Sequence, residues 1–132
     1  MANFYQEVFD CLPVPPERHL SGQWLAEGTG LKSAELSGIH LRLPGFGDQG
    51  PTLEIFQYTH SEGKLETKPN REGFGHIAFE VDDVTNALRT VLSHGGSTVG
   101  KVTSRDIPGV GLLTFVYVAD PEGNIIELQS WK

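Results

Sequence analysis

The sequence contains very little cysteine, with Cys11 as its one thiol among 132 residues. A single thiol excludes an intramolecular disulfide framework and favours a reducing compartment. The chain also lacks an apolar run long enough to span a bilayer, and its first residues lack the pattern of a secretion signal. We therefore predict a cytoplasmic protein with no membrane partner.

Positive charge is scarce as well. The chain has 10 Lys and Arg residues against 17 Asp and Glu, which gives a formal net charge of −7. Nucleic-acid binding needs a basic surface, so this composition argues against a nucleic-acid partner. The length suits one domain, since domains typically run to about 100–200 residues. We predict a single domain over residues 1–132.

The second half of the chain has the clearer hydrophobic pattern. Apolar and polar residues alternate over Gly75–Val81, which predicts a strand. Asp82 and Asp83 then offer an N-cap, and apolar residues recur at helical spacing over Val84–Leu92. These features predict a strand followed by a helix. Three further strands are expected at Ser97–Thr103, Leu112–Ala119 and Asn124–Trp131.

The first half repeats this order without the opening strand. Helical spacing predicts a helix over Asn3–Phe9, and the proline-rich run Leu12–Pro16 indicates an extended connection. The sequence thus predicts an α+β fold of two βαβββ modules, about 1–60 and about 73–132, joined by a polar linker at about 61–72. The strand preceding the first helix is missing from the pattern. Strands of the first module are expected at Gln23–Ala26, Glu35–Leu43 and Thr52–Tyr58.

Three side chains that can bind a metal fall on the polar faces of these strands. Side chains alternate between the two faces of a strand, so the apolar neighbours of Glu54, His76 and Glu127 place all three opposite the helices. One imidazole and two carboxylates suit a divalent ion such as Zn, Ni, Co, Mn or Fe. Glu54 or Glu127 can also act as a general base. The same pattern fits a solvated sheet face without a metal, and both interpretations stay open here.

Four other residues are candidates for a substrate pocket. His40 lies on a polar strand face and fits either a substitute metal ligand or a pocket-lining role. Phe56 and Tyr117 fit a pocket wall or ordinary core packing. Arg105, in an expected loop, fits an anchor for a substrate anion or a solvated charge.

Longer motifs carry a resemblance to a known family. Gly73–Asp83 and Asp120–Leu128 resemble the second module of the glyoxalase and vicinal-oxygen-chelate family. Asn3–Phe9 is similar to the first helix of that family, and Pro51–Phe56 to its glutamate strand. The resemblance covers nearly the whole chain and is specific to the superfamily rather than to one activity.

This resemblance implies a cup-shaped mixed sheet around a divalent metal, often in a homodimer. It assigns His76, Glu127 and Glu54 as metal ligands, with a glutamate of this set transferring a proton. Members usually take a further ligand from the first strand, which this sequence lacks. We expect the vacant sheet edge to be covered in a dimer or by a rearranged segment.

The implied activity is that of a metal-dependent lyase or isomerase acting on a small oxygen-chelating molecule, such as a thiohemiacetal of a 2-oxoaldehyde. A non-catalytic, ligand-sequestering protein of the bleomycin-resistance type is the alternative from another class. An extradiol-type dioxygenase is a second enzymatic alternative, although it usually requires two histidines and one carboxylate.

Overall fold

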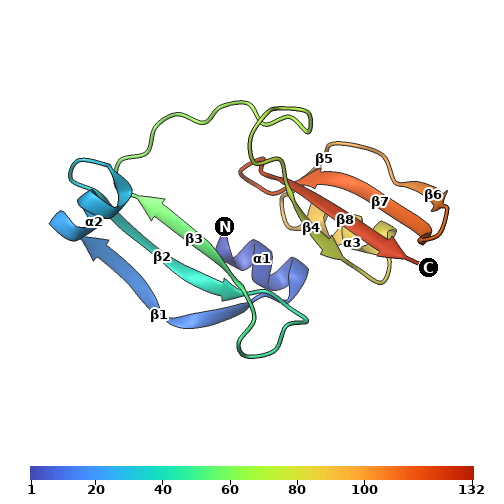
Figure 1. Ribbon diagram of the computed structural model, residues 1–132, viewed down its shortest axis with the longest axis horizontal. Coiled ribbons are helices and arrows are strands. Elements are labelled where there is room, and N and C mark those ends of the chain that lie inside the picture. Colours follow the sequence, from blue (N-terminus) through green and yellow to red (C-terminus); the bar gives the residue numbers. More distant parts are fainter. The chain divides into compact units, whose positions relative to one another are not determined.

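The computed structural model describes all residues from 1 to 132, and they divide into two compact units. The first unit is Met1–Leu65 and the second is Glu66–Lys132 (Figure 1). No helix of the chain is long and apolar enough to cross a membrane. The elements of the first unit are α1 (Ala2–Phe9), β1 (Leu12–Ser21), α2 (Gln23–Thr29), β2 (Glu35–Arg42) and β3 (Thr52–Tyr58).

The first unit is built on a three-stranded antiparallel sheet in the order β1-β2-β3. Glu54 on β3 lies directly opposite His40 on β2. Opposed residues share a face of the sheet, so both side chains project from the same face. The buried Leu41 follows His40 on β2 and therefore belongs to the opposite face. α1 is the first element of the chain, as the sequence predicted, and it contacts β2.

The proline-rich run was predicted as an extended connection, but it forms the first half of a paired strand, β1. Proline lacks a backbone N–H and is tolerated in a sheet mainly on an edge strand. β1 is such an edge, because β2 is its one partner. The pairing is also interrupted, since the register shifts between Val14 and Arg18.

The prediction of a strand at Gln23–Ala26 is wrong, because these residues begin the helix α2. Leu25 is the one buried residue of this helix, so the segment has too little amphipathic pattern to reveal its helical period. Gly30 ends the helix in the left-handed conformation, with φ at 71°. Leu25 packs with Leu36, Phe56 and other residues in a small apolar cluster at the end of the sheet where β3 finishes (Figure 1).

The second unit contains one helix and five strands. Its sheet runs β4-β8-β7-β5, and β6 also pairs with β7. β4 is parallel to β8, and the other pairs are antiparallel. The elements are β4 (Ile77–Glu80), α3 (Val84–Ser93), β5 (Ser97–Thr98), β6 (Thr103–Ile107), β7 (Gly111–Ala119) and β8 (Ile125–Trp131).

The predicted helix of the second unit is confirmed, including its cap. The Asp83 side chain accepts a hydrogen bond of 2.9 Å from the Asn86 amide. α3 contacts β7 and β8, where Val116, Val118 and Leu128 are buried. The alternation in the sequence therefore identified the helix-covered face of this sheet correctly.

The single strand predicted at Ser97–Thr103 is divided between two strands, β5 and the start of β6. The amides of Val99 and Gly100 both donate to the carbonyl oxygen of Tyr117, at 3.0 Å each. Two consecutive residues thus share one acceptor, which interrupts the regular ladder as a bulge does. The α+β class and the two sheets are confirmed.

Candidate functional site

His76 and Glu127 form a close polar pair in the second unit. His76 Nε2 lies 3.0 Å from Glu127 Oε2, within hydrogen-bond distance. The two side chains are 30% and 15% exposed. Both come from the edge of the sheet where β4 and β8 run in parallel: His76 directly precedes β4, and Glu127 lies on β8.

Tyr117 packs against this pair. It lies directly opposite Glu127 on β7, and its ring centroid is 4.8 Å from that of His76. Burial, and then the negative charge of Glu127, raise the pKa of the Tyr117 phenol above its ordinary value. The phenol therefore stays protonated at neutral pH and can donate a hydrogen bond.

Arg105 lies in a strand, β6, and the sequence prediction of a loop is therefore wrong. Its partner in the ladder is Leu113, which precedes Phe115 and Tyr117 on β7 at intervals of two residues. Arg105 therefore projects from the same face of the sheet as Tyr117. The side chain is exposed and available to an anion on that face.

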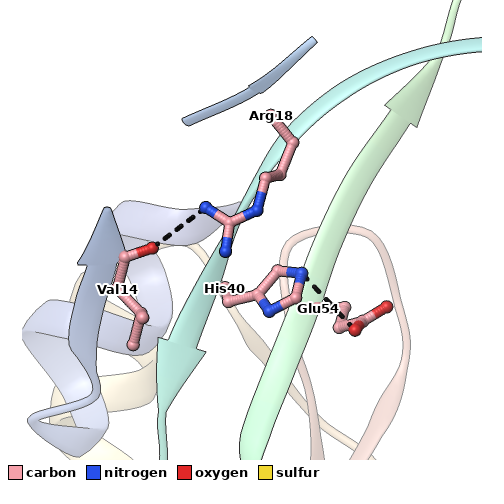
Figure 2. Close-up of polar contacts among 4 residues, drawn as sticks. All are labelled: Val14, Arg18, His40 and Glu54. Atoms are coloured by element: carbon pink, nitrogen blue, oxygen red, sulfur yellow. Dashed lines mark hydrogen bonds and ion pairs between the residues drawn. The ribbon is translucent and has the colours of Figure 1, made fainter. Parts of the chain in front are cut away.

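The first unit holds a second pair of the same type. His40 Nε2 lies 3.4 Å from Glu54 Oε1, and the side chains are 23% and 55% exposed (Figure 2). The ring of Phe56 lies 5.6 Å from that of His40, between centroids, so Phe56 packs beside the imidazole. His40 and Phe56 thus both lie next to Glu54 on one face of the sheet, and the same face packs against α2 at Leu36 and Tyr58.

Arg18 is a residue on this face that sequence analysis missed. Its Nη1 donates to the carbonyl oxygen of Val14 at 3.2 Å, across the irregular part of β1 (Figure 2). This hydrogen bond holds the guanidinium against β1, the strand that pairs with β2. Arg18 lies two residues after the Pro15–Pro16 pair, and the segment has no apolar–polar alternation to indicate which face Arg18 takes.

Both pairs fit the donor chemistry of a divalent metal. Nitrogen and oxygen donors lie about 2.0–2.2 Å from zinc, so two donors at angles of about 90–110° are about 2.8–3.6 Å apart. The separations of 3.0 Å and 3.4 Å fall in this range. Neither unit by itself brings together three or more His, Cys, Asp or Glu side chains for a metal. Each unit supplies two donors, and the joint role of Glu54, His76 and Glu127 stays a prediction.

Comparison with solved structures identifies the fold of this chain. The fold is that of a glyoxalase family protein from Bacillus cereus, with a TM-score of 0.80 at 20% identity over 98% of this chain and 83% of the other. A glyoxalase family protein from Enterococcus faecalis gives a TM-score of 0.59 at 24% identity, over 96% of this chain and 83% of the other. At these identities the likeness establishes the fold alone.

The family follows from the sequence match. Residues 1–128 match the Glyoxalase/Bleomycin resistance protein/Dioxygenase superfamily, and the chain belongs to it. A probable lactoylglutathione lyase from Vibrio parahaemolyticus serotype O3:K6 (strain RIMD 2210633) is 36% identical over 91 residues, which are 67% of this chain. The match spans 60% of the length of that relative.

Proposed function

We propose that this protein is a metal-dependent lyase or isomerase of the glyoxalase type, with Glu54, His76 and Glu127 as ligands of a divalent metal. The observation that carries the proposal is the His76–Glu127 pair, with its donors 3.0 Å apart and its side chains largely shielded from solvent. Family membership and the name of the Vibrio relative support the same reaction class. Zn, Ni, Co, Mn and Fe all suit this donor set.

The proposed reaction moves a proton between neighbouring carbons of a thiohemiacetal formed from a 2-oxoaldehyde and a thiol. When bound, a divalent ion supplies Lewis-acid polarisation of a substrate oxygen. A glutamate takes the proton from the carbon that carries sulfur and returns it to the adjacent carbonyl carbon, which gives a hydroxy thioester. Glu54 and Glu127 are the candidate bases. Glu54 is the better placed for the transfer, because it is 55% exposed whereas Glu127 is 15% exposed.

The proposed substrate site is lined by Tyr117, Phe56, His40 and Arg105. Tyr117 keeps its proton, since its pKa is raised, and can donate to a substrate oxygen beside His76. Arg105 offers a cation on the same sheet face for a substrate carboxylate. The buried Cys11 has its pKa raised to about 11 by burial and by Asp10, so it is an inert thiol rather than a reactive group.

The test combines metal analysis with activity. The purified chain is stripped with a chelator, reloaded separately with each of the five metals, and assayed for thioester formation from a 2-oxoaldehyde and glutathione. We expect one metal to restore activity, and Glu127→Ala to lose both the metal and the activity. Glu54→Gln should lose about 10²–10⁴-fold in rate, the usual contribution of a general base. A protein that retains no divalent metal after reloading would overturn the proposal.

Ligand sequestration is the competing function, and the aromatic rings beside each pair favour it. Tyr117 packs on His76 and Phe56 on His40, and rings of this kind can bind an aromatic cation. Stoichiometric binding of such a compound by the metal-free chain, without any turnover, would favour sequestration. Oxygen consumption with a catechol in the iron-loaded chain would favour the dioxygenase alternative.

We also propose that the protein forms a homodimer in which the outer edge of β3 is paired. β3 has β2 as its one partner, whereas the glutamate strand of the second unit, β8, lies between β4 and β7. An unpaired edge presents free N–H and C=O groups that folded proteins tend to cover. Sedimentation equilibrium should give a dimer, and a monomer throughout the micromolar range would contradict this.

A further inference from the structure

Arg18 is a partly buried cation that no carboxylate neutralises. Of the 10 Lys and Arg residues, Arg18 and Arg42 are partly buried and the others are exposed. Arg42 forms an ion pair of 3.3 Å with Asp48, whereas none of the ion pairs of the chain includes Arg18. Burial removes water from a charge, and a nearby counter-charge compensates for that loss. Arg18 thus carries an uncompensated positive charge in a chain whose formal net charge is −7.

The pairing of the strands places Arg18 on the sheet face that carries the His40–Glu54 pair. Arg18 lies opposite Gly38, and Gly38 lies opposite Phe56, so these three residues form one row across β1, β2 and β3. His40 and Glu54 form the next row on the same face, because alternate residues of a strand share a face. All five residues therefore belong to one face of one sheet.

The guanidinium of Arg18 reaches the row of His40. Arg18 Nη1 donates to the carbonyl oxygen of Val14 at 3.2 Å, and Val14 is the direct ladder partner of His40. In the view of Figure 2 the guanidinium lies between the Val14 carbonyl and the His40 imidazole. The register shift between Val14 and Arg18 is a bulge of β1, which lets the side chain turn back along its own strand.

Most of the guanidinium is free to bind a ligand. The group has five N–H donors in one plane, and the Val14 carbonyl accepts from one of its nitrogens. Glu54 forms its ion pair with His40, at 3.4 Å, and none with Arg18. A planar fork of N–H groups matches two oxygens of a carboxylate or of a phosphoryl group. The remaining donors of Arg18 therefore suit an oxyanion.

Phe56 provides an apolar surface in the row of Arg18. A Cβ atom at Gly38 would lie 2.6 Å from Phe56 Cδ1, so the Phe56 ring occupies the space that a side chain at Gly38 would fill. Phe56 is partly buried and also packs against the cluster of Leu25 and Leu36. The ring is thus held in place beside the row, where it can contact the apolar part of an anionic molecule.

We propose that Arg18 binds a carboxylate or phosphoryl group of a small organic anion, on the sheet face that carries His40 and Phe56. The residues of this site all lie in the first unit. The site needs neither a metal nor turnover, so it is independent of the proposed metal-dependent reaction. It adds a negative charge to the chemistry of the bound molecule, whether that molecule is a substrate or a sequestered ligand.

The experiment titrates the metal-free full chain with inorganic phosphate and, separately, with acetate. The pH is kept neutral, and chloride keeps the ionic strength constant. The imidazole carbon–proton resonances of His40, assigned by their absence in His40→Gln, report on the site. We expect at least one of the two anions to shift these resonances saturably, whereas chloride alone should not. The anion that saturates at the lower concentration identifies the bound group as phosphoryl or carboxylate.

Variants of Arg18 test its role against a matched control. Arg18→Gln keeps an amide that can donate to Val14 but removes the charge, and it should raise the dissociation constant of the anion about 10-fold or more. Arg18→Lys keeps the charge without the planar fork, so its effect should be smaller. Arg89 is an exposed arginine on α3 in the second unit. Arg89→Gln changes the net charge equally and should leave the dissociation constant within about twofold of the wild type.

Glu54→Gln should have the opposite effect. This substitution removes a negative charge from the same sheet face, so the anion should bind about twofold more tightly or better. A purely structural role for Arg18 predicts a different result. Arg18→Gln would then unfold at a lower urea concentration than the wild type, while its dissociation constant for the anion would not change.

Three outcomes would overturn the inference. The first is a wild type in which neither phosphate nor acetate shifts the His40 resonances saturably at millimolar concentrations. The second is an unchanged dissociation constant in both Arg18 variants, and Arg18→Lys keeps this test available where Arg18→Gln fails to fold. The third is an equal loss of affinity in Arg89→Gln, because the effect would then be that of net charge. Since the protein is metal-free throughout, a failure of the proposed reaction would leave each of these results unchanged.

Discussion

Gly38 is the position where a single methyl group should perturb the structure most sharply. A Cβ atom at this site would lie 2.0 Å from the carbonyl oxygen of Ile55 and 2.9 Å from Phe56 Cα, both of which are backbone atoms of β3. Neither can move aside in the way a flexible side-chain end does. Gly38→Ala must therefore push β2 and β3 apart at the centre of the first sheet.

The magnitude follows from the cost of overpacking. Inserting a methyl group into a filled space typically costs 1–3 kcal/mol, and the backbone contacts at Gly38 place this case near the upper end, at about 2–3 kcal/mol. A glycine replaced in open space behaves differently. Gly28 lies in α2 with nothing within 4 Å of a built Cβ atom, so Gly28→Ala should stabilise the chain by about 0.5–1 kcal/mol.

The assay is urea unfolding of both variants beside the wild type, followed by far-UV circular dichroism. Tryptophan fluorescence in a Trp131→Phe background gives a local signal, because the remaining Trp24 lies in α2, next to Leu25 of the apolar cluster that includes Phe56. A Gly38→Ala variant that unfolds at the wild-type urea concentration or above would refute the close approach of β2 and β3.

Other parts of the chain give further predictions. Asp120→Ala should lower the free energy of unfolding, measured by urea denaturation, by about 2–3 kcal/mol. The buried Asp120 carboxylate accepts hydrogen bonds from two backbone amides and from the Asn124 side chain. A loss below about 0.5 kcal/mol would contradict this. The Cys11 thiol, buried and with a pKa raised to about 11, stays neutral at pH 8, so a disulfide reagent should label it only as the protein unfolds; rapid labelling of the native chain would refute its burial. Absorbance titration should show one tyrosine phenol that ionises at a higher pH than usual, because burial and then the Glu127 charge raise the pKa of Tyr117. Tyr117→Phe should remove this ionisation, and Glu127→Gln should shift it to lower pH. An unchanged titration in Glu127→Gln would contradict the contribution of the Glu127 charge.

The sequence predicted the second unit better than the first, and the reason is physical. Alternation over β4 and helical spacing over α3 both reflect burial of one face, and that burial is present in the structure. Leu25 is the one buried residue of α2, so the sequence of this segment shows no helical spacing of apolar residues. β1 carries prolines, which normally argue against a strand. They are tolerated because β1 lies at the edge of the sheet, a position that is set by the tertiary structure.

The candidate site was predictable to a similar extent. Strand alternation predicted Glu54 and His76 on polar faces. In the structure His40 lies 3.4 Å from Glu54, and Glu127 lies 3.0 Å from His76. The register that sets His40 opposite Glu54 depends on the length of the loop between β2 and β3, which side-chain pattern does not encode. Arg18 was missed because the irregular pairing of β1 decides which face it takes.

The prolines of β1 have a consequence for how copies of this chain associate. Of the two outer borders of the first sheet, one is formed by a strand that carries Pro13, Pro15 and Pro16 and loses its regular pairing after Val14. Such a border resists the addition of another chain, whereas the β3 border has no proline after Thr52. In the proposed homodimer, strand addition to the first sheet would therefore use the β3 border. With its β3 border paired in that homodimer, the first sheet would offer no second open border from which a fibre could grow.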